Sequence, residues 1–191
     1  MSGSRDSSHF GQLYQSNPDP WGFLTDPYEA AKYRHSLEVL GERRFVSGLE
    51  VGCSIGVLTR LLAARCDALL ALDIVDQPLQ AAAQRCADQP WVRFRQMQVP
   101  GQWPAGRFDL IVLSEVLYFL SPADIDRCAA LVAGSVLPNA KVLLVNWLGQ
   151  SDDPCSGDQA ADRFIAATAG KSRIERQDRP ERYRLDLLAI G

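Results

Sequence analysis

The segment from Leu49 to Gly56 constrains the fold most, because it combines an apolar strand pattern with a turn that contains two glycines. Its residues read Leu-Glu-Val-Gly-Cys-Ser-Ile-Gly, and a helical pattern follows. A second apolar run at 68–72 ends at Asp73, which lies 17 residues after Gly56. Strand, glycine turn, helix, strand and acidic residue, in this order, are typical of one half of a nucleotide-binding α/β fold.

The rest of the chain continues this alternation of strand and helix patterns. Helices are expected at about 28–40, 57–66, 78–87, 121–136 and 158–169. Strands are expected at about 46–52, 68–74, 91–99, 108–113, 141–147, 171–177 and 183–190. We therefore predict an α/β protein of Rossmann-like architecture, with a mostly parallel seven-stranded sheet, helices on both faces and an antiparallel last strand.

Composition is that of an ordinary globular protein. The 191 residues carry a net charge of -3, with 47% hydrophobic and 23% charged residues, which fits one domain with a sizeable core. The sequence shows neither the basic excess typical of nucleic-acid binding nor an apolar run typical of a signal peptide or membrane span. We expect a cytoplasmic monomer or dimer that binds neither nucleic acid nor a membrane.

The cysteines and histidines do not form a recognisable metal motif. Five cysteines are scattered without any C-x-x-C pair, and the two histidines, His9 and His35, lie far from a cysteine pair. Three of the cysteines fall in expected helices among alanine and leucine. We therefore expect free, buried thiols in a reducing compartment, and no metal.

The first 40 residues precede the first core strand. Residues 1–8 are small and polar and are expected to be disordered, so the folded domain is expected at 9–191. The part of the chain at 9–40 carries six aromatic residues that have no evident place in a sheet: Phe10, Tyr14, Trp21, Phe23, Tyr28 and Tyr33. We expect this part, the lid segment, to fold over the ligand and exclude water.

Glu50 separates the possible nucleotide ligands. Dinucleotide sites usually carry G-x-G-x-x-G, which this turn lacks. An acidic residue two positions before Gly52, with Gly56 four positions further on, resembles class I S-adenosylmethionine (SAM)-dependent methyltransferases, although Ser54 replaces their middle glycine. That resemblance implies SAM as cofactor and S-adenosylhomocysteine as its product.

The same resemblance implies a set of cofactor contacts. Asp73 would accept hydrogen bonds from the ribose, and Lys32 would pair with the SAM carboxylate. Gln98 and Met97 would contact the adenine, although an acidic residue is usual there and a plain strand end is the alternative. The full expected set is Lys32, Glu50, Gly52, Cys53, Ser54, Gly56, Asp73, Ile74, Met97, Gln98 and Ser114.

Four segments together resemble a narrower family. They are Asp19-Pro20-Trp21, Pro27-Tyr28-Glu29, the Glu50 turn and Ser114-Glu115-Val116-Leu117-Tyr118. They resemble the nodulation protein S (NodS) family over roughly residues 10–148. Members of that family are SAM-dependent N-methyltransferases that methylate the free amine of a deacetylated chitooligosaccharide. The resemblance implies a small-molecule acceptor, most simply the amine of an amino sugar or another small metabolite; Ser54, Gln98 and the short tail after residue 150 depart from the family.

Glu115 and Tyr118 are the expected catalytic residues. They follow the strand at 108–113, and ligands of open α/β sheets bind at the carboxyl ends of strands. A carboxylate or a phenol there would hold an amine and take its proton. The alternative is that Glu115 only caps the next helix. Asn146 and Trp147, after the strand at 141–147, are further candidates for the rim of the site.

Other functions remain open at this point. A small-molecule O-methyltransferase would need a stronger base, for which His35 is the candidate, and a SAM-binding module would bind the cofactor without turnover. The basic residues between Lys171 and Arg184 alternate with acidic ones, which favours a solvated strand pair over an anion site.

Overall fold

The computed structural model describes residues 3–191. Contacts between residues divide this chain into two compact units. The N-terminal unit comprises residues 6–98, and the C-terminal unit comprises residues 99–191 together with the short segment 3–5. Within residues 3–191, no helix combines the length and the apolar character needed to cross a membrane.

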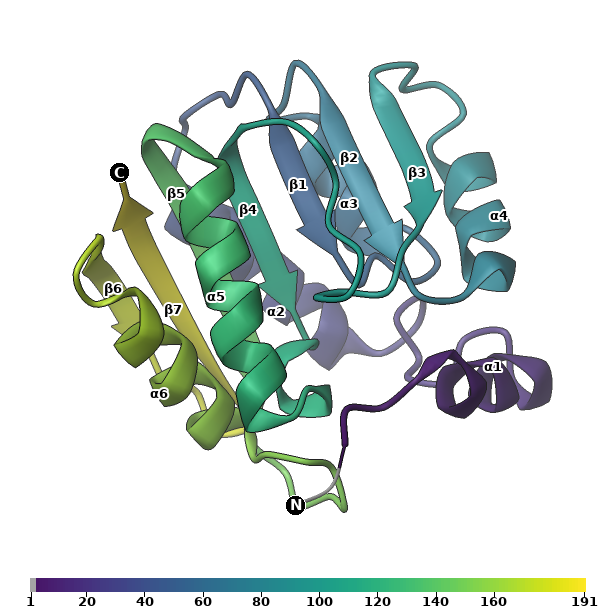
Figure 1. Cartoon of the computed structure of the whole chain (residues 1–191). Helices are drawn as coiled ribbons and strands as arrows, with labels where there is room; N and C mark the ends of the chain where they lie inside the picture. Colours follow the sequence, from purple (N-terminus) through teal and green to yellow (C-terminus); the bar gives the residue numbers. More distant parts are fainter. Residues whose placement is uncertain (1–2) are drawn as a thin grey trace. The chain divides into compact units, whose positions relative to one another are not determined.

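The N-terminal unit holds three parallel strands and four helices, coloured purple to teal in Figure 1. Its elements are α1 (Ser7–Ser16), α2 (Pro27–Leu40), β1 (Gly48–Val51), α3 (Val57–Ala63), β2 (Leu69–Asp73), α4 (Asp76–Arg85) and β3 (Val92–Gln96). β2 pairs in parallel with both β1 and β3. All four residues of β1 are buried, as expected for a strand covered on both faces.

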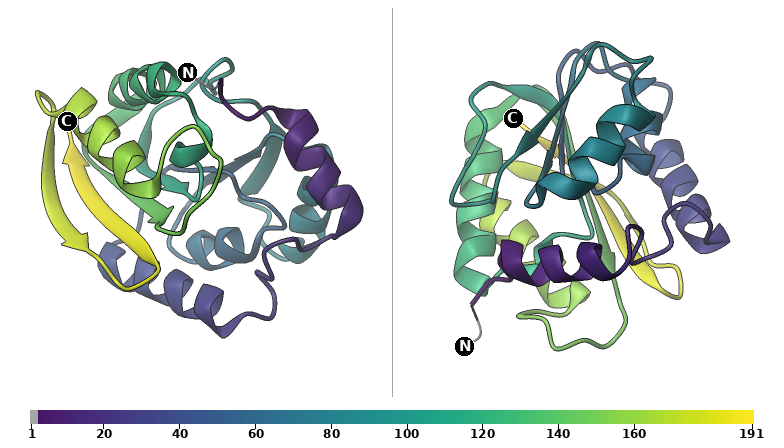
Figure 2. Two further views of the ribbon diagram at one scale, coloured as in Figure 1. Left: turned by 90° about the horizontal axis from the view of Figure 1, so that it is seen from below. Right: turned by 90° about the vertical axis from the view of Figure 1, so that its right-hand side faces the viewer.

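Helix α1 is not among the helices that the sequence predicts. We predicted disorder through residue 8, but α1 begins at Ser7 because the Asp6 carboxylate accepts hydrogen bonds from the backbone N–H groups of Ser8 and His9. The helix then lies beside α4, although the two are far apart in the sequence (Figure 2). A hydrogen bond of 3.1 Å from Gln77 Nε2 to the Tyr14 carbonyl oxygen joins them.

The C-terminal unit holds four strands, of which only β7 runs opposite to the other three. Its elements are β4 (Phe108–Ser114), the 3-10 turn η1 (Leu117–Phe119), α5 (Pro122–Ser135), β5 (Val136–Trp147), α6 (Gly157–Thr168), β6 (Ser172–Asp178) and β7 (Tyr183–Ile190). β4 and β5 are parallel, whereas β7 runs antiparallel to both β5 and β6. Helices α5 and α6 lie side by side (Figure 1).

Strand β5 is longer than the expected 141–147. A register shift opposite Phe108 and Leu110 lets the strand include residues 136–140, although the sequence favours a helix to residue 136 and a turn at 137–140. The strand order is β3-β2-β1 in the N-terminal unit and β4-β5-β7-β6 in the C-terminal unit. The predicted fold class, a seven-stranded, mostly parallel sheet with an antiparallel last strand, is therefore confirmed. All five cysteines are buried and free, as predicted.

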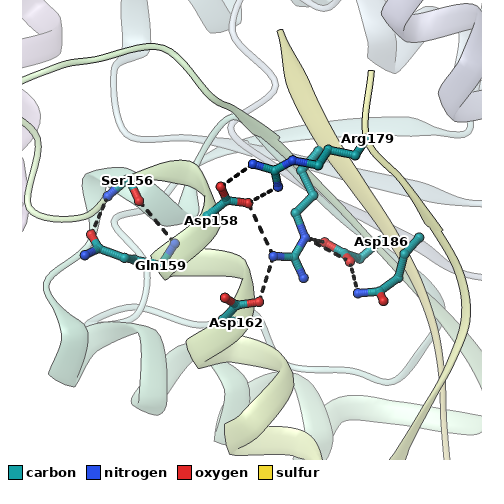
Figure 3. A network of polar contacts seen from close by, with 8 residues as sticks. Ser156, Asp158, Gln159, Asp162, Arg179 and Asp186 are labelled. Atoms are coloured by element: carbon teal, nitrogen blue, oxygen red, sulfur yellow. Dashed lines mark hydrogen bonds and ion pairs between the residues drawn. The ribbon is translucent and has the colours of Figure 1, made fainter. Parts of the chain in front are cut away.

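Four of the basic residues near the C-terminus form ion pairs with carboxylates of the same unit: Arg173, Arg176, Arg179 and Arg184. Figure 3 shows the contact of Arg179 with Asp158. Arg184, only 12% exposed, contacts Asp162 at 2.7 Å and the fully buried Asp186 at 2.9 Å. Arg179 contacts Asp158 and is the main cause of its lowered pKa. These positive charges already have acidic partners. The arrangement therefore favours a pair of strands with ion pairs over a binding site for an anion.

We expect Arg184→Met to lower the free energy of unfolding by about 2–4 kcal/mol, because it leaves the Asp186 carboxylate buried without its cationic partner. The double variant Arg184→Met/Asp186→Leu removes both charges and should recover most of that loss. Urea unfolding of the wild type and both variants measures this. If the double variant is no more stable than the single one, the loss of stability does not come from the unpaired Asp186 carboxylate.

Candidate functional site

The glycine turn between β1 and α3 has an unusual backbone. Gly52, Ser54 and Gly56 have φ angles of +80°, +48° and +79°, all in the left-handed region. A Cβ atom at Gly56 would also lie 2.8 Å from the Ala82 backbone of α4, so this position excludes any side chain for two reasons. Ser54 holds the same conformation at a cost of about 1–2 kcal/mol, which glycine would avoid.

Asp73 fixes this turn to the end of β2. Its Oδ2 accepts a hydrogen bond of 2.8 Å from the Ser54 backbone N–H, and its Oδ1 accepts one of 3.0 Å from Val75. The side chain is buried, and burial raises the pKa of the carboxyl to about 6. Each carboxylate oxygen has a second lone pair, so Asp73 keeps the capacity to accept hydroxyl groups of a ligand.

Glu50 is a buried acid with one carboxylate oxygen that lacks a hydrogen-bond partner within residues 3–191. The residue is 1% exposed, and among the described residues its Oε2 has no hydrogen-bond partner. Burial raises the pKa of the carboxyl to about 7, and the negative charge of Asp73 adds to the rise. Buried polar atoms in native proteins are nearly always paired, so an orphaned carboxylate oxygen fits a ligand that brings a positive charge or an N–H donor.

Part of the lid segment lies against the turn. The Tyr14 hydroxyl of α1 is 2.5 Å from the Ser54 hydroxyl oxygen, and the tyrosine is 3% exposed. A row of aromatic rings continues from it, with centroid distances of 5.6 Å to Trp21, then 5.5 Å to Phe23 and 6.3 Å to Tyr33. Sequence reasoning did not find the contact of Tyr14 with Ser54, because no local pattern links positions 40 residues apart.

Lys32 sits at the far end of this row of rings. Its ammonium is 2.9 Å from the Glu29 carboxylate, and it lies 5.2 Å from the ring centroid of Tyr28 and 5.9 Å from that of Tyr33. Both members of the ion pair are buried within the N-terminal unit. Lys32 is therefore already ion-paired with Glu29, and a SAM carboxylate would be its second acidic partner.

The remaining expected cofactor residues of this unit surround the same strand ends. Cys53 packs against Ala71 and Leu79, and burial raises the pKa of its thiol well above the ordinary value. The Met97 N–H donates to the Asp73 carbonyl oxygen at 2.9 Å, which places residue 97 next to the end of β2. Ile74, which directly follows Asp73, is half-buried. Gln98 is exposed.

The expected catalytic pair lies in the C-terminal unit, and the structure brings its two members together. Glu115 has a φ of +58°, rare for a residue other than glycine, and directly follows the buried Ser114. Its Oε2 accepts 2.9 Å hydrogen bonds from the Tyr118 hydroxyl and from the Trp147 N–H. Helix α5 is capped by Ser121 instead, so the helix-capping alternative for Glu115 does not hold.

Comparisons with known proteins show the family and the fold of this chain. The sequence model of the family described as Nodulation protein S (NodS) matches residues 12–141, which is more than half of the chain. The chain belongs to the NodS family. Nodulation protein S of Bradyrhizobium diazoefficiens is 32% identical over 105 residues, covering 53% of this chain and 49% of that protein. Nodulation protein S of Sinorhizobium fredii is 30% identical over 112 residues, covering 58% and 52%. This NodS-family chain thus spans about half the length of the curated relatives it matches.

Solved structures of related proteins share the fold. N-methyltransferase NodS from Bradyrhizobium japonicum, in complex with S-adenosyl-L-homocysteine, superposes with a TM-score of 0.81 at 21% identity, over 94% of this chain and 98% of that one. A putative methyltransferase from Pseudomonas syringae superposes with a TM-score of 0.74 at 32% identity, over 85% and 98%. The class I methyltransferase fold that the sequence resemblance implied is therefore confirmed for this chain.

Glu50 should make the stability of the ligand-free protein depend on pH. Its pKa in the folded state is about 7, above the ordinary value of 4.5, so the folded state holds the proton more tightly than the unfolded state. Protonated Glu50 therefore contributes up to about 3 kcal/mol to the free energy of unfolding below about pH 4.5. This contribution is lost as the pH rises through 7.

We expect Glu50→Gln, which stays neutral, to be more stable than the wild type at pH 7.5 and to differ little from it at pH 4.5. Urea unfolding at a series of pH values, each comparing the two proteins, measures this difference. A constant difference across the series would contradict the buried, protonated state of Glu50.

Proposed function

We propose that this NodS-family chain is a SAM-dependent methyltransferase that acts on the amine of a small molecule. The observation that carries the proposal is the buried Glu50, with an orphaned carboxylate oxygen beside a left-handed glycine turn fixed by Asp73. Family membership supports it, and so does the fold shared with N-methyltransferase NodS. SAM supplies an activated methyl group, whose transfer to a nucleophile leaves S-adenosylhomocysteine.

The residues of the N-terminal unit would bind and orient the cofactor. Asp73 would accept the ribose hydroxyls through its remaining lone pairs, and the turn backbone would allow close approach. Glu50 would receive an N–H donor of the bound molecule, which would satisfy the orphaned oxygen. The lid segment would exclude water, a role that the buried Tyr14–Ser54 contact supports.

The residues of the C-terminal unit would handle the acceptor. An amine arrives as an ammonium ion and must lose a proton before its lone pair can attack, and a carboxylate favours binding of the charged form. Glu115 would hold this ion and take the proton. The Tyr118 hydroxyl and the Trp147 N–H, which already donate to Glu115, would fix the direction of the carboxylate.

We expect Asp73→Ala to weaken SAM affinity about 10- to 150-fold, because hydrogen bonds to a charged group contribute roughly 1.5–3 kcal/mol. Asp76→Ala is the matched control, since it removes an exposed carboxylate three residues away. Isothermal titration calorimetry with SAM measures both. Unchanged affinity in the Asp73 variant would remove this residue from the cofactor site.

We expect Glu115→Gln to slow methyl transfer far more than it weakens SAM binding, because the amide can still accept from Tyr118 but cannot accept a proton. The wild-type rate should rise with pH as the acceptor amine deprotonates. Single-turnover measurements with labelled SAM and a panel of amino sugars and small amines test both points. A glutamine variant as fast as the wild type would exclude Glu115 from the chemistry.

The same assay separates the alternative functions. Methylation of hydroxyl groups only would favour the O-methyltransferase, and SAM binding without transfer to any amine or hydroxyl would favour a binding module.

A further inference from the structure

Asn146, next to the last residue of β5, is a buried polar residue without a partner. It is 0% exposed, and across residues 3–191 neither its Nδ2 nor its Oδ1 has a hydrogen-bond partner. Buried side-chain polar atoms are paired in the large majority of cases, and an unpaired buried amide costs stability. The position therefore keeps a polar side chain that the fold itself does not use.

The residues of α6 that are packed near Asn146 have small side chains or none. It pairs in register with Arg184 of β7, and directly opposed residues of antiparallel strands share one face of the sheet. Arg184 reaches Asp162 of α6, so Asn146 lies on the face that α6 covers. A Cβ atom at Gly157, the first residue of α6, would lie 3.2 Å from the Asn146 Cβ. The next buried residues of α6 are also small: Ala160 and Ala161.

Asn146 is also close to the expected catalytic carboxylate. The N–H of the next residue, Trp147, donates to Glu115 Oε2 at 2.9 Å. The Asn146 Cα lies about 2.4 Å from that nitrogen, from standard bond lengths, so it is within about 5 Å of the carboxylate. The backbone at Asn146 therefore lies next to the carboxylate that would hold the acceptor amine.

The loop at 148–156 contacts residues on both sides of this region. A Cβ atom at Gly149 would lie 1.8 Å from the Trp147 indole, and the Cys155 N–H donates to the Tyr118 carbonyl oxygen at 3.3 Å. The loop thus begins against Trp147 and ends against Tyr118, while its residues 150–152 are exposed.

We propose that Asn146 hydrogen-bonds a hydroxyl group next to the reacting amine of the acceptor, and so selects amines that carry such a hydroxyl. An amide offers a donor and an acceptor, and a hydroxyl group matches either, whereas an ionised group matches only one. The inference rests on the proposed function, because it assumes that the amine is held by Glu115. It adds a residue that determines which amines are accepted.

The test uses two probes that differ only in the hydroxyl group, trans-2-aminocyclohexanol and cyclohexylamine. Methyl transfer from SAM gives kcat/KM for each, and calorimetry of the full chain saturated with S-adenosylhomocysteine gives each Kd. The wild type should prefer the amino alcohol about 10-fold in both measurements. Asn146→Leu should reduce the preference to about 1, keep the affinity for SAM and raise the melting temperature.

Two further variants complete the test. Asn146→Asp, whose carboxylate can still accept from the hydroxyl group, should keep part of the preference even if the leucine variant folds poorly. Thr168→Val removes a buried hydroxyl that is bonded to the Phe164 carbonyl oxygen at 3.1 Å. This control should lower the melting temperature and leave the preference unchanged.

The outcomes separate this inference from the proposed function. A wild type that binds both probes equally, or a leucine variant that keeps the wild-type preference, overturns the role of Asn146. A leucine variant that loses stability and keeps the preference points to a buried structural water and also overturns it. No methyl transfer to any amine overturns the proposed function, while the two Kd values still decide whether Asn146 reads the hydroxyl group.

Discussion

The site depends on two carboxyl groups buried beside a left-handed turn. Glu50 and Asp73 lie at the ends of neighbouring parallel strands, and burial raises the pKa of both. Asp73 offsets part of this cost by accepting backbone N–H groups, and these bonds fix the conformation of the turn. Glu50 has one oxygen that nothing in the described chain satisfies. A fold that keeps such a group is adapted to a molecule that supplies the missing donor.

Much of this arrangement is predictable from the sequence, because it depends on short patterns. Apolar runs flanked by turn residues identify buried parallel strands, and the distance from the glycine turn to Asp73 places the acid at the next strand end. The first half of β5 is not predictable in this way, because Leu137-Pro138-Asn139-Ala140 reads as a turn and a register shift absorbs it. Helix α1 carries Gly11 and few apolar residues, so its burial depends on contacts with distant residues.

The two units show the same relation between stability and function. In the N-terminal unit Glu50 has an unsatisfied oxygen, and in the C-terminal unit Asn146 has an unsatisfied amide. Both are almost completely buried, and an apolar residue of similar size would stabilise the ligand-free fold at either position. Sequence reasoning can mark such residues as polar, but only the packing shows that they lack partners. In both of our proposals, a bound molecule supplies the missing partner.

The buried thiols have a consequence for how motion in this protein can be followed. Cys53 lies in the glycine turn, Cys155 lies at the end of the 148–156 loop, and burial raises the pKa of both thiols. Only an exposed thiolate reacts readily with alkylating reagents. Each cysteine therefore reacts only when its own segment unfolds locally. Among the five buried thiols, Cys53 reports on the glycine turn and Cys155 on the loop, provided that labelling is resolved residue by residue. The labelling rates of these two cysteines would measure local opening of the turn and of the loop separately, without any introduced probe.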